Sequence, residues 1–473
     1  MKVCLLNDSF PPVIDGVVNV MMNYADHLIA DHGCEIMIGT PEYPGTDYST
    51  YPYPVAAYPS LNTAAFTNGY RTGIPMAFKE LEQMKEFGPD IIHSHCPASA
   101  TIIARVLREQ CEAPVVFTYH TKYDIDITRA FKLRPLIEEG INTMVTNIEA
   151  CDDIWVVSRG AGESLKKLGM TRDYIVMNNG VDFAKGKVSD ELVRETTEGY
   201  DLPEGVPVFL YVGRLIGYKG LPMLLDALAL MKDAYDFRMV FVGKGPDEDL
   251  LKNKAEKLGL SDKCIFTGPI YNRDHLRAWD TRADLFLFPS SFDTNGLVVR
   301  EAAACGLASV LIKDSCAAEG ITDGHNGFLI EENEESLAEF LRQHGQDLPM
   351  LHEAGMNAMN EIYMSWDECV DTAYKRYQTV LDMKKSGTLP EHKTSTADFL
   401  FAITNRTLEE SERLRRFRKA LFDDFRATAH GMMENIMEED HIWTKFRDEK
   451  LPEITEMMEE FRKEAMKKYG DTI

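Results

Sequence analysis

Several features that mark other classes of protein are missing from this chain of 473 residues. No apolar run approaches the roughly 18 residues that a bilayer-spanning helix needs, and Asn7 and Asp8 interrupt the apolar start of the chain. Basic residues are scarce, since 51 Lys and Arg stand against 76 Asp and Glu and leave a formal net charge of −25. Nucleic-acid phosphates are bound by clustered Lys and Arg, so this balance argues against broad nucleic-acid binding. The sequence predicts neither an exported nor a membrane-spanning protein.

Paired cysteines are also missing. The nine cysteines are scattered and odd in number, and they form no Cys-x-x-Cys pair, so neither a disulfide framework nor a zinc site is predicted. We expect reduced thiols in a cytoplasm. His93 and His95 flank a predicted strand end, but no third and fourth ligand lies near them in the sequence. We therefore expect these two histidines to pack and to form hydrogen bonds.

Two common nucleotide-binding motifs are absent as well. Gly243 and Gly245 lack the third glycine of G-x-G-x-x-G, and Gly213 to Lys219 does not keep the spacing G-x-x-x-x-G-K-[ST]. Neither a dinucleotide-dependent dehydrogenase nor a P-loop enzyme is supported. Asp124-Ile125-Asp126 matches the D-x-D of some metal-dependent sugar transferases, but such a short match carries little information among 76 acidic residues.

The chain does contain two long stretches in which short apolar runs alternate with helical patterns. Hydrophobic residues make up 44% of the chain and charged residues 27%, which is typical of a soluble globular protein, and the length predicts two to four domains. The alternation is the signature of parallel sheets covered by helices. The runs that we interpret as strands are 3–7, 35–39, 91–94, 115–119 and 154–157, then 208–212, 239–242, 264–266 and 285–288. A polar, charged stretch from Phe183 to Gly205 separates the two sets.

The most informative stretch runs from Phe288 to Gly306. Its apolar start stops at Pro289, and Ser, Asp, Thr, Asn and Gly follow, which favour turns and caps before an Ala-rich helix. Asp293 lies in the predicted loop, and Glu301 lies eight residues later, about two helical turns on. The two carboxylates can therefore address different parts of one elongated ligand.

Other strand-to-helix loops carry candidate ligand contacts. Gly16 precedes an amphipathic helix and can let backbone N–H groups approach a ligand, although a plain turn has the same pattern. Arg214 and Lys219 share a glycine-containing loop after a strand, which indicates either anion binding or two solvated cations. His120 follows the strand 115–119, at the end where open parallel sheets bind ligands, although a lone histidine is more often structural.

Eight short motifs follow one another along the chain: Phe10-Pro11-Pro12 with Asp15-Gly16-Val17, Pro89 to His95, Thr118-Tyr119-His120-Thr121, Val157-Ser158, Asn179-Gly180-Val181-Asp182, Gly213-Arg214 with Lys219-Gly220, Val242 to Pro246, and Phe288 to Gly306. In this order they resemble the retaining glycosyltransferases of family 4, over residues 1 to about 385. That family has the α/β GT-B fold, in which the parallel sheets of two Rossmann-like domains face a cleft. The resemblance implies an acceptor-side domain over 1–183, a nucleotide-sugar domain over 184–365 and a crossover helix over 366–387.

The resemblance also implies roles for single residues. Arg214 and Lys219 would bind the donor diphosphate and stabilise the charge that grows there as the sugar–phosphate bond breaks, so both would be catalytic. Asp293 and His120 would contact the donor sugar, and Glu301 would bind the ribose hydroxyls.

Further donor contacts are implied for the backbone. Gly16 would let the first loop approach the donor, and the backbone near Ile270 would bind the base. The amides near Asn295, Gly296 and Leu297 would meet the sugar and phosphate at a helix start. Asp15 and Tyr123 are placed on the acceptor side, and Asp15 or His120 is a candidate to assist deprotonation of the acceptor. Apart from the nucleotide-sugar co-substrate, the resemblance implies no cofactor and no metal.

One position departs from the family pattern, since the paired-acid motif usually begins with Glu and this chain has Asp293. The sequence from Thr294 to Leu297 and the Tyr-His-Thr signature look most like members that glycosylate lipids, including diacylglycerol. We therefore expect a hexosyltransferase that moves a sugar from a nucleotide sugar, with UDP as the expected nucleotide, to a lipid, saccharide or small-molecule hydroxyl. The alternative is a nucleotide-sugar-binding subunit with low activity in a glycosylation complex.

The segment 388–473 lies outside the resemblance and is predicted to be a helical extension. Its apolar residues recur three or four apart, which indicates an amphipathic helix or hairpin. A basic cluster between Arg413 and Lys419 could touch an anionic membrane from the cytoplasmic side or form a solvated face. The extension could alternatively bind the acceptor or pair two copies of the chain. No motif in the predicted loops Tyr43–Thr72 and Lys122–Arg134 identifies the acceptor.

Overall fold

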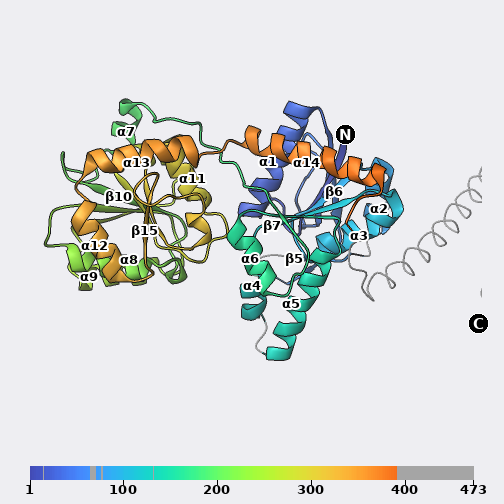
Figure 1. Cartoon of the computed structure of the whole chain (residues 1–473), viewed down its shortest axis with the longest axis horizontal. Helices are drawn as coiled ribbons and strands as arrows, with labels where there is room; N and C mark the ends of the chain where they lie inside the picture. The colour runs from blue at the N-terminus through green and yellow to red at the C-terminus, as the bar shows by residue number, and fades with distance from the viewer. Residues whose placement is uncertain (14, 64–70, 76–77, 131–132, 391–473) are drawn as a thin grey trace, which may run out of the picture. The chain divides into compact units, whose positions relative to one another are not determined.

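Two parallel sheets organise the chain (Figure 1). The computed structural model describes residues 1–13, 15–63, 71–75, 78–130 and 133–390. They belong to one contact unit, Met1–Asp398, and the second unit, Phe399–Ile473, lies outside the described residues. The predicted amphipathic extension and its basic cluster therefore fall almost entirely outside the described part.

The first sheet has seven parallel strands in the order β3-β2-β1-β6-β7-β8-β9. Its strands are β1 (Lys2–Leu6), β2 (Glu35–Pro41), β3 (Val55–Tyr58), β6 (Ile91–Ser94), β7 (Val115–Tyr119), β8 (Asp153–Val156) and β9 (Ile175–Val176). All residues of β7 are buried, as expected for a strand covered on both faces. The chain runs outward from β1 to β3, then returns to β6 and runs the other way, so the switch point of this sheet lies between β1 and β6.

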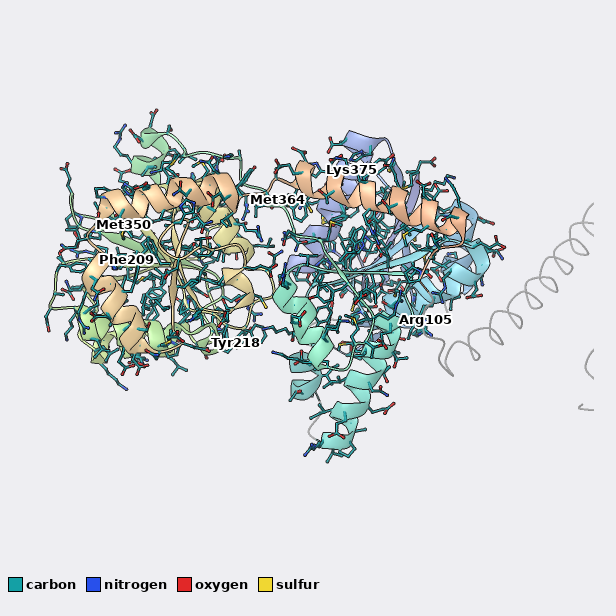
Figure 2. The ribbon with its side chains drawn as sticks, viewed as in Figure 1. Arg105, Phe209, Tyr218, Met350, Met364 and Lys375 are labelled. Carbon is teal, nitrogen blue, oxygen red and sulfur yellow. The ribbon has the colours of Figure 1, made fainter. Side chains whose placement is uncertain are left out.

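The second sheet has six parallel strands in the order β12-β11-β10-β13-β14-β15. Its strands are β10 (Val208–Val212), β11 (Arg238–Val242), β12 (Cys264–Gly268), β13 (Leu285–Phe288), β14 (Ser309–Ile312) and β15 (Phe328–Ile330). Phe209 of β10 lies inside the core of this domain (Figure 2). By the same reasoning, the switch point of this sheet lies between β10 and β13.

Helices cover both sheets. Those around the first sheet are α1 (Gly16–His32), α2 (Phe78–Phe87), α3 (Ser99–Cys111), α4 (Tyr123–Ala130), α5 (Arg134–Glu149) and α6 (Arg159–Lys167). Those of the second half are α7 (Asp190–Thr197), η1 (Gly217–Lys219), α8 (Leu221–Met231), α9 (Glu248–Lys257), α10 (Arg273–Arg282), α11 (Leu297–Ala304), η2 (Cys316–Ala318), α12 (Glu334–His344), α13 (Leu348–Glu361) and α14 (Trp366–Ser386). A short hairpin of β4 (Ser60–Asn62) and β5 (Arg71–Gly73) completes the described elements. None of the described helices is long and apolar enough to cross a membrane.

The last described helix, α14, packs with the first domain although it follows the second in sequence. Trp366 and Tyr377 are buried in the same core as Val3 and Leu5, and Figure 1 shows α14 in orange beside α1. The guanidinium of Arg376 forms two hydrogen bonds with the Asp153 carboxylate of β8, at 2.7 and 2.8 Å. The chain enters this helix through Met364, labelled in Figure 2, whose carbonyl accepts a hydrogen bond from Val181 N at 3.0 Å.

The nine predicted strands are confirmed. The loop predictions were partly wrong. Lys122–Arg134 contains α4, and Tyr43–Thr72 contains β3 and β4 and the start of β5. The polar stretch before Gly205 contains α7, none of whose residues is buried, so its sequence has no apolar stripe to detect.

Candidate active site

Two neighbouring strands at the centre of the second sheet deliver most of the predicted donor-site residues. The loop after β10 carries Arg214 and Lys219, and the loop after β13 carries Asp293. Because β10 and β13 pair in parallel, their carboxyl ends lie side by side. This is the crevice in which open α/β sheets bind ligands.

Glycines allow the loops at this crevice to pack closely. A Cβ on Gly220 would lie 2.0 Å from the Pro289 carbonyl oxygen, and the backbone there has φ +77°. A Cβ on Gly243 would lie 1.9 Å from the carbonyl oxygen of Gly213, and one on Gly245 would lie 2.1 Å from that of Leu215. Gly243 and Gly245, which do not form a dinucleotide-binding motif, therefore have a packing role, because they let two loops contact each other through their backbones.

Gly220→Ala is expected to lower the free energy of unfolding by at least about 2 kcal/mol, because it combines a left-handed backbone with a clash against Pro289. Gly205→Ala is the matched control, since Gly205 has φ +76° but nothing within 4 Å of its Cβ position. Urea unfolding of both variants measures the difference. Equal losses would show that the loops after β10 and β13 do not pack as described.

Lys219 and Asp293 form an ion pair across this crevice. The second carboxylate oxygen of Asp293 accepts a hydrogen bond from Ser290 Oγ at 2.6 Å. An ammonium has three donors, so Lys219 keeps donors for a further anion. Arg214 is exposed and forms no ion pair or side-chain hydrogen bond with any described residue. Among the described residues, the loop after β10 therefore carries an exposed arginine without an ion pair and a lysine that Asp293 holds in place.

Helix α11 begins at the same place. Gly296 is its N-cap with φ +61°, and a Cβ there would lie 2.8 Å from the Ala317 Cβ. No described side chain caps the helix, so backbone N–H groups near Leu297 stay available, and the positive end of the helix dipole favours an anion. Asn295 accepts a hydrogen bond from Arg300 Nε at 3.1 Å, and its Nδ2 is buried without a partner among the described residues.

The residues expected to bind the nucleoside lie in α11 and in the segment after β12. Glu301 forms an ion pair with Arg273 at 2.5 Å, and Asp182 lies 3.7 Å from the same guanidinium. Burial raises the pKa of Glu301, and Arg273 opposes this rise. Ile270 follows β12 and packs, partly buried, against the core of the second domain. A ribose hydroxyl that binds Glu301 would have to share this carboxylate with Arg273.

The loop that carries Asp293 also touches the first domain. Thr294 Oγ1 donates a hydrogen bond to the carbonyl of His120 at 2.5 Å, and Ser158 Oγ donates one to the carbonyl of Thr294 at 2.5 Å. Lys122 Nζ donates a third to the carbonyl of Ser291 at 3.2 Å. Residues 291–294 therefore lie against the carboxyl ends of β7 and β8 and bring His120 next to the loop of Asp293.

His93, His95 and His120 form a buried group beneath this contact. His93 Nδ1 lies 2.6 Å from Tyr377 Oη and its Nε2 lies 2.7 Å from Thr118 Oγ1, while His95 Nδ1 lies 2.9 Å from His120 Nε2. Burial lowers the pKa of all three imidazoles, that of His120 to about 3. All three are neutral at pH 7. The prediction that His93 and His95 pack and form hydrogen bonds is confirmed.

The residues placed on the acceptor side have different surroundings. Asp15 is the N-cap of α1, since its Oδ1 accepts hydrogen bonds at 2.8 Å from the N–H groups of Val17 and Val18 and its Oδ2 accepts one from Ser9 Oγ at 3.0 Å. This carboxylate is engaged locally by three hydrogen bonds. A Cβ on Gly16 would have nothing within 4 Å, so this loop leaves open space.

Tyr123 is the first residue of α4, and its hydroxyl donates a hydrogen bond to the carbonyl of His95 at 3.2 Å. Burial raises its pKa well above the ordinary range, so the phenol stays protonated. Asp124 follows it, but the side chain of Asp126 is outside the described part, so the D-x-D pair is not described as a whole. Among the described residues one trio could hold a metal ion, His27, Asp31 and Asp367, but it is exposed on α1 and α14 rather than at strand ends.

Asp8 is a buried carboxylate that was not among the predicted site residues. It follows β1 at the switch point of the first sheet, and its Oδ1 accepts hydrogen bonds from Ala100 N at 3.0 Å and from Tyr58 Oη at 3.4 Å. Its Oδ2 is buried without a hydrogen-bond partner among the described residues, and burial raises its pKa. The sequence feature that could have pointed to Asp8 is its position directly after a buried strand, where polar residues often contact a ligand.

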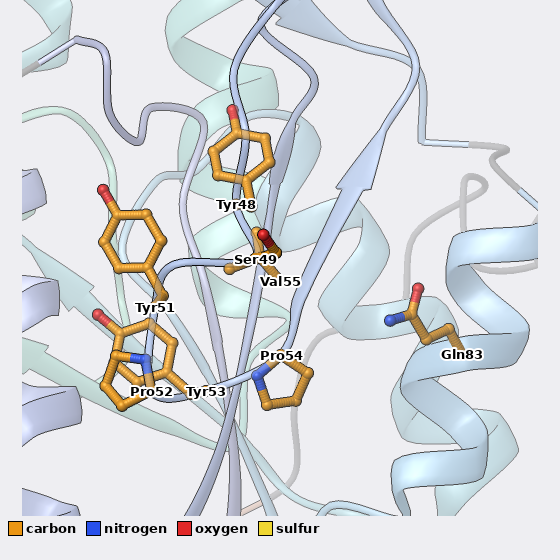
Figure 3. A pocket seen from close by; sticks show the side chains of 8 residues that line it. All are labelled: Tyr48, Ser49, Tyr51, Pro52, Tyr53, Pro54, Val55 and Gln83. Carbon is orange, nitrogen blue, oxygen red and sulfur yellow. The ribbon is translucent and has the colours of Figure 1, made fainter.

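A cavity of about 410 Å³ lies elsewhere on the first domain, beside the segment that leads into β3 (Figure 3). Its aromatic side chains include Tyr48 and Tyr51, both of which also contact the Phe10 ring in the first loop, at centroid distances of 6.0 and 5.1 Å. The full lining is Tyr48, Ser49, Tyr51, Pro52, Tyr53, Pro54, Val55 and Gln83. No sequence motif pointed to it.

Comparison with known protein families identifies the family to which the chain belongs. The model of glycosyltransferase family 4 matches residues 14–185, and the model of glycosyl transferases group 1 matches residues 193–360. The chain belongs to the family 4 type of GT-B glycosyltransferases. The predictions of this family, of the GT-B fold and of a hexosyltransferase enzyme are therefore confirmed.

Curated relatives of this GT-B glycosyltransferase are distant. The sulfoquinovosyl transferase SQD2 of Arabidopsis thaliana is 28% identical over 59% of this chain, and the alignment spans about half of that relative, 53%. The alpha-monoglucosyldiacylglycerol synthase of Streptococcus pneumoniae is 24% identical over 65% of this chain and 70% of its own. A GDP-mannose-dependent alpha-mannosyltransferase of Corynebacterium glutamicum is 24% identical over 70% of this chain and 77% of its own.

Solved structures share the fold of this glycosyltransferase. Anabaena Alr3699/HepE in complex with UDP superposes with a TM-score of 0.65 at 18% identity, covering 80% of this chain and 100% of that one. The sucrose-phosphate synthase of Thermosynechococcus elongatus gives a TM-score of 0.63 at 17% identity, with 80% and 99% covered. At these identities the likeness concerns the fold alone.

Proposed function

We propose that this glycosyltransferase moves a hexose from a UDP-sugar to an acceptor hydroxyl with retention of configuration. The observation that carries the proposal is the meeting of Arg214, Lys219 and the uncapped start of α11 at the switch point of the second sheet. A nucleoside diphosphate is an elongated anion, and this crevice presents two cations and a helix N-terminus.

The proposed mechanism uses these groups in the bond-breaking step. As the sugar–phosphate bond breaks, the electron pair stays on the leaving diphosphate, and its negative charge grows. Lys219 and Arg214 would stabilise that charge more strongly in the transition state than in the bound donor, which lowers the barrier. Asp293 holds the Lys219 ammonium from the opposite side and so orients it. Since cations and a helix dipole supply the charge, we propose that no metal is needed.

The assignment of donor and acceptor rests on relatives. HepE has been crystallised in complex with UDP-glucose, and two relatives are named alpha-monoglucosyldiacylglycerol synthases, which supports UDP-glucose and a glycerolipid hydroxyl. The Corynebacterium relative is named for GDP-mannose, so that donor is the main competitor. A cytoplasmic location, peripheral contact with a membrane and pairing of two copies through residues 388–473 are part of the same proposal.

We place the acceptor at the switch point of the first sheet. Asp8 after β1 and Tyr123 at the start of α4 are buried polar groups there, and the open space beside Gly16 lies in the same β1 to α1 connection. Asp8 is a better candidate than Asp15 for binding an acceptor hydroxyl, because it has a carboxylate oxygen without a partner among the described residues.

One observation favours a second candidate function, a nucleotide-sugar-binding subunit with low activity. Both carboxylate oxygens of Asp293 are engaged, by Lys219 and by Ser290, and the side chain is one methylene shorter than the usual Glu. This geometry fits a chain that binds the donor but positions its sugar poorly. Measuring the rate of sugar transfer distinguishes an active transferase from a nucleotide-sugar-binding subunit.

A two-step measurement tests the proposal. UDP-, GDP- and ADP-sugars are first compared by thermal shift, since a ligand that binds the native state raises its apparent stability. The donor with the largest shift is then incubated with diacylglycerol vesicles and with simple glycosides, and the anomeric configuration of the product is read by NMR. We expect UDP-glucose to shift the unfolding temperature most and the product to keep the α configuration. An inverted product would contradict retention, and binding without turnover of any acceptor would favour the subunit.

A further inference from the structure

His95 and His120 form a buried pair of rings joined by one hydrogen bond. His95 Nδ1 and His120 Nε2 lie 2.9 Å apart, and the two rings stack with a centroid distance of 5.2 Å and an interplanar angle of 20°. Burial lowers the pKa of both imidazoles, so each ring is neutral and carries one N–H. One of the two nitrogens must therefore donate and the other must accept.

The two possible arrangements leave different groups unpaired. The outer nitrogens, His95 Nε2 and His120 Nδ1, have no hydrogen-bond partner among the described residues. If His95 Nδ1 donates, the unpaired N–H is on His120 Nδ1. If His120 Nε2 donates, the unpaired N–H is on His95 Nε2. A buried donor without a partner costs about 1 to 3 kcal/mol, and an unpaired acceptor is tolerated more often.

The places of the two rings in the fold separate the two cases. The side chain of His95 is completely enclosed, and its ring lies against Tyr24 and against His93, whose centroid is 4.0 Å away. His120 Nδ1 is buried as well, but the backbone of His120 lies where the first domain meets the loop of Asp293, since its carbonyl accepts a hydrogen bond from Thr294 Oγ1. A ligand that enters between these segments would have to part them to reach an N–H on His120, whereas an N–H on His95 stays enclosed by Tyr24 and His93.

We propose that His95 is a positioning residue that donates from Nδ1 to His120 Nε2 and so holds His120 as the tautomer with a proton on Nδ1. His120 then offers an N–H donor to an oxygen of the ligand. On the proposed function, which this step requires, that oxygen is a hydroxyl of the donor sugar. The arrangement adds affinity for the sugar part of the donor and none for the nucleotide part.

The surroundings of His95 fix its own orientation. Tyr123 Oη donates to the carbonyl of His95, and the neighbouring His93 is held at both ring nitrogens by Tyr377 and Thr118. Tyr377 belongs to α14, so the helix that returns to the first domain helps to hold the histidine group in place. A flip of the His95 ring would break its hydrogen bond to His120.

NMR of the protein labelled with ¹⁵N-histidine tests the tautomer without any ligand. At pH 7.5 we expect the His120 ring, assigned by its loss in His120→Asn, to show a protonated Nδ1 and an unprotonated Nε2 in its two-bond couplings to the ring protons. In His95→Leu the preference should be lost, and in His95→Asn, which can place an amide donor near the position of Nδ1, it should be kept. A protonated Nε2 on His120 in the wild-type chain overturns the proposal.

Calorimetric titration with UDP and UDP-glucose then tests the consequence. We expect His95→Leu to lower the affinity for UDP-glucose by about 3- to 10-fold, the range of one hydrogen bond, while the affinity for UDP stays the same and His95→Asn binds both like the wild type. An equal loss for UDP and UDP-glucose, or no loss for either, overturns the positioning role. If the wild-type chain binds no UDP-sugar, the proposed donor is wrong, and the NMR result still decides the tautomer.

Discussion

Replacing Arg214 or Lys219 with alanine is expected to lower kcat/KM for transfer or donor hydrolysis by about 10²- to 10³-fold. Both cations lie at the carboxyl end of β10, where the diphosphate would gain negative charge as the sugar leaves. Steady-state rates with the best donor of the panel give the size of the loss. Lys257→Ala, which removes an exposed lysine at the end of α9, is the matched control and should leave the rate unchanged.

The ion pair between Lys219 and Asp293 allows a sharper form of this experiment. Lys219→Ala alone leaves the Asp293 carboxylate, 21% exposed, without its cation, so part of its effect falls on stability rather than on the reaction. The double variant Lys219→Ala with Asp293→Asn should regain thermal stability but not activity. Arg214 has no such partner among the described residues, so Arg214→Ala should leave stability unchanged. Wild-type rates in both single variants would remove these residues from the site.

Acidification below pH 6.5 is expected to destabilise the fold through His93, His95 and His120. Each imidazole has a lowered pKa in the folded chain, about 3 for His120, and an ordinary pKa near 6.5 in the unfolded chain. The unfolded state therefore binds more protons below pH 6.5, and the free energy of unfolding falls as the pH falls. Each histidine contributes about 1.4 kcal/mol per pH unit in this window, or about 4 kcal/mol for the three together.

A variant isolates this contribution from that of the carboxyl groups. Asp280 is buried with a raised pKa, so it works in the opposite direction and makes the fold more stable as the pH falls through that pKa. The carboxyl contributions are the same in the wild type and in His120→Asn, so they cancel when the two are compared. In the variant, the free energy of unfolding should fall less steeply with acidification, by about 1.4 kcal/mol per pH unit. Urea unfolding between pH 7.5 and 5 gives both slopes. Parallel curves would show that His120 is not buried in its neutral form.

The elements that the sequence predicted well are those with strong local signals. The strands around Leu210, Val240 and Leu287 are buried on both faces, so they leave contiguous apolar runs in the sequence. The loop residues Arg214 and Asp293 were found because they follow such runs directly. By contrast, β14 and β15 are short and were not predicted as strands.

The interactions between side chains could not be predicted from the sequence. Lys219 and Asp293 are 74 positions apart, and their pairing depends on β10 and β13 being neighbours in the sheet. The contact of Thr294 with His120 joins segments 174 positions apart. The roles of Asp8 and His95 depend on what surrounds them, because burial and missing hydrogen-bond partners are properties of the folded chain alone.

A crystal structure of the complex with UDP tests the central claim most directly. The account predicts the diphosphate at the carboxyl ends of β10 and β13, within hydrogen-bonding distance of Arg214 and Lys219 and at the start of α11. It also predicts a ribose hydroxyl at Glu301. A nucleotide bound elsewhere, for instance in the tyrosine-lined cavity of the first domain, would contradict the assigned site.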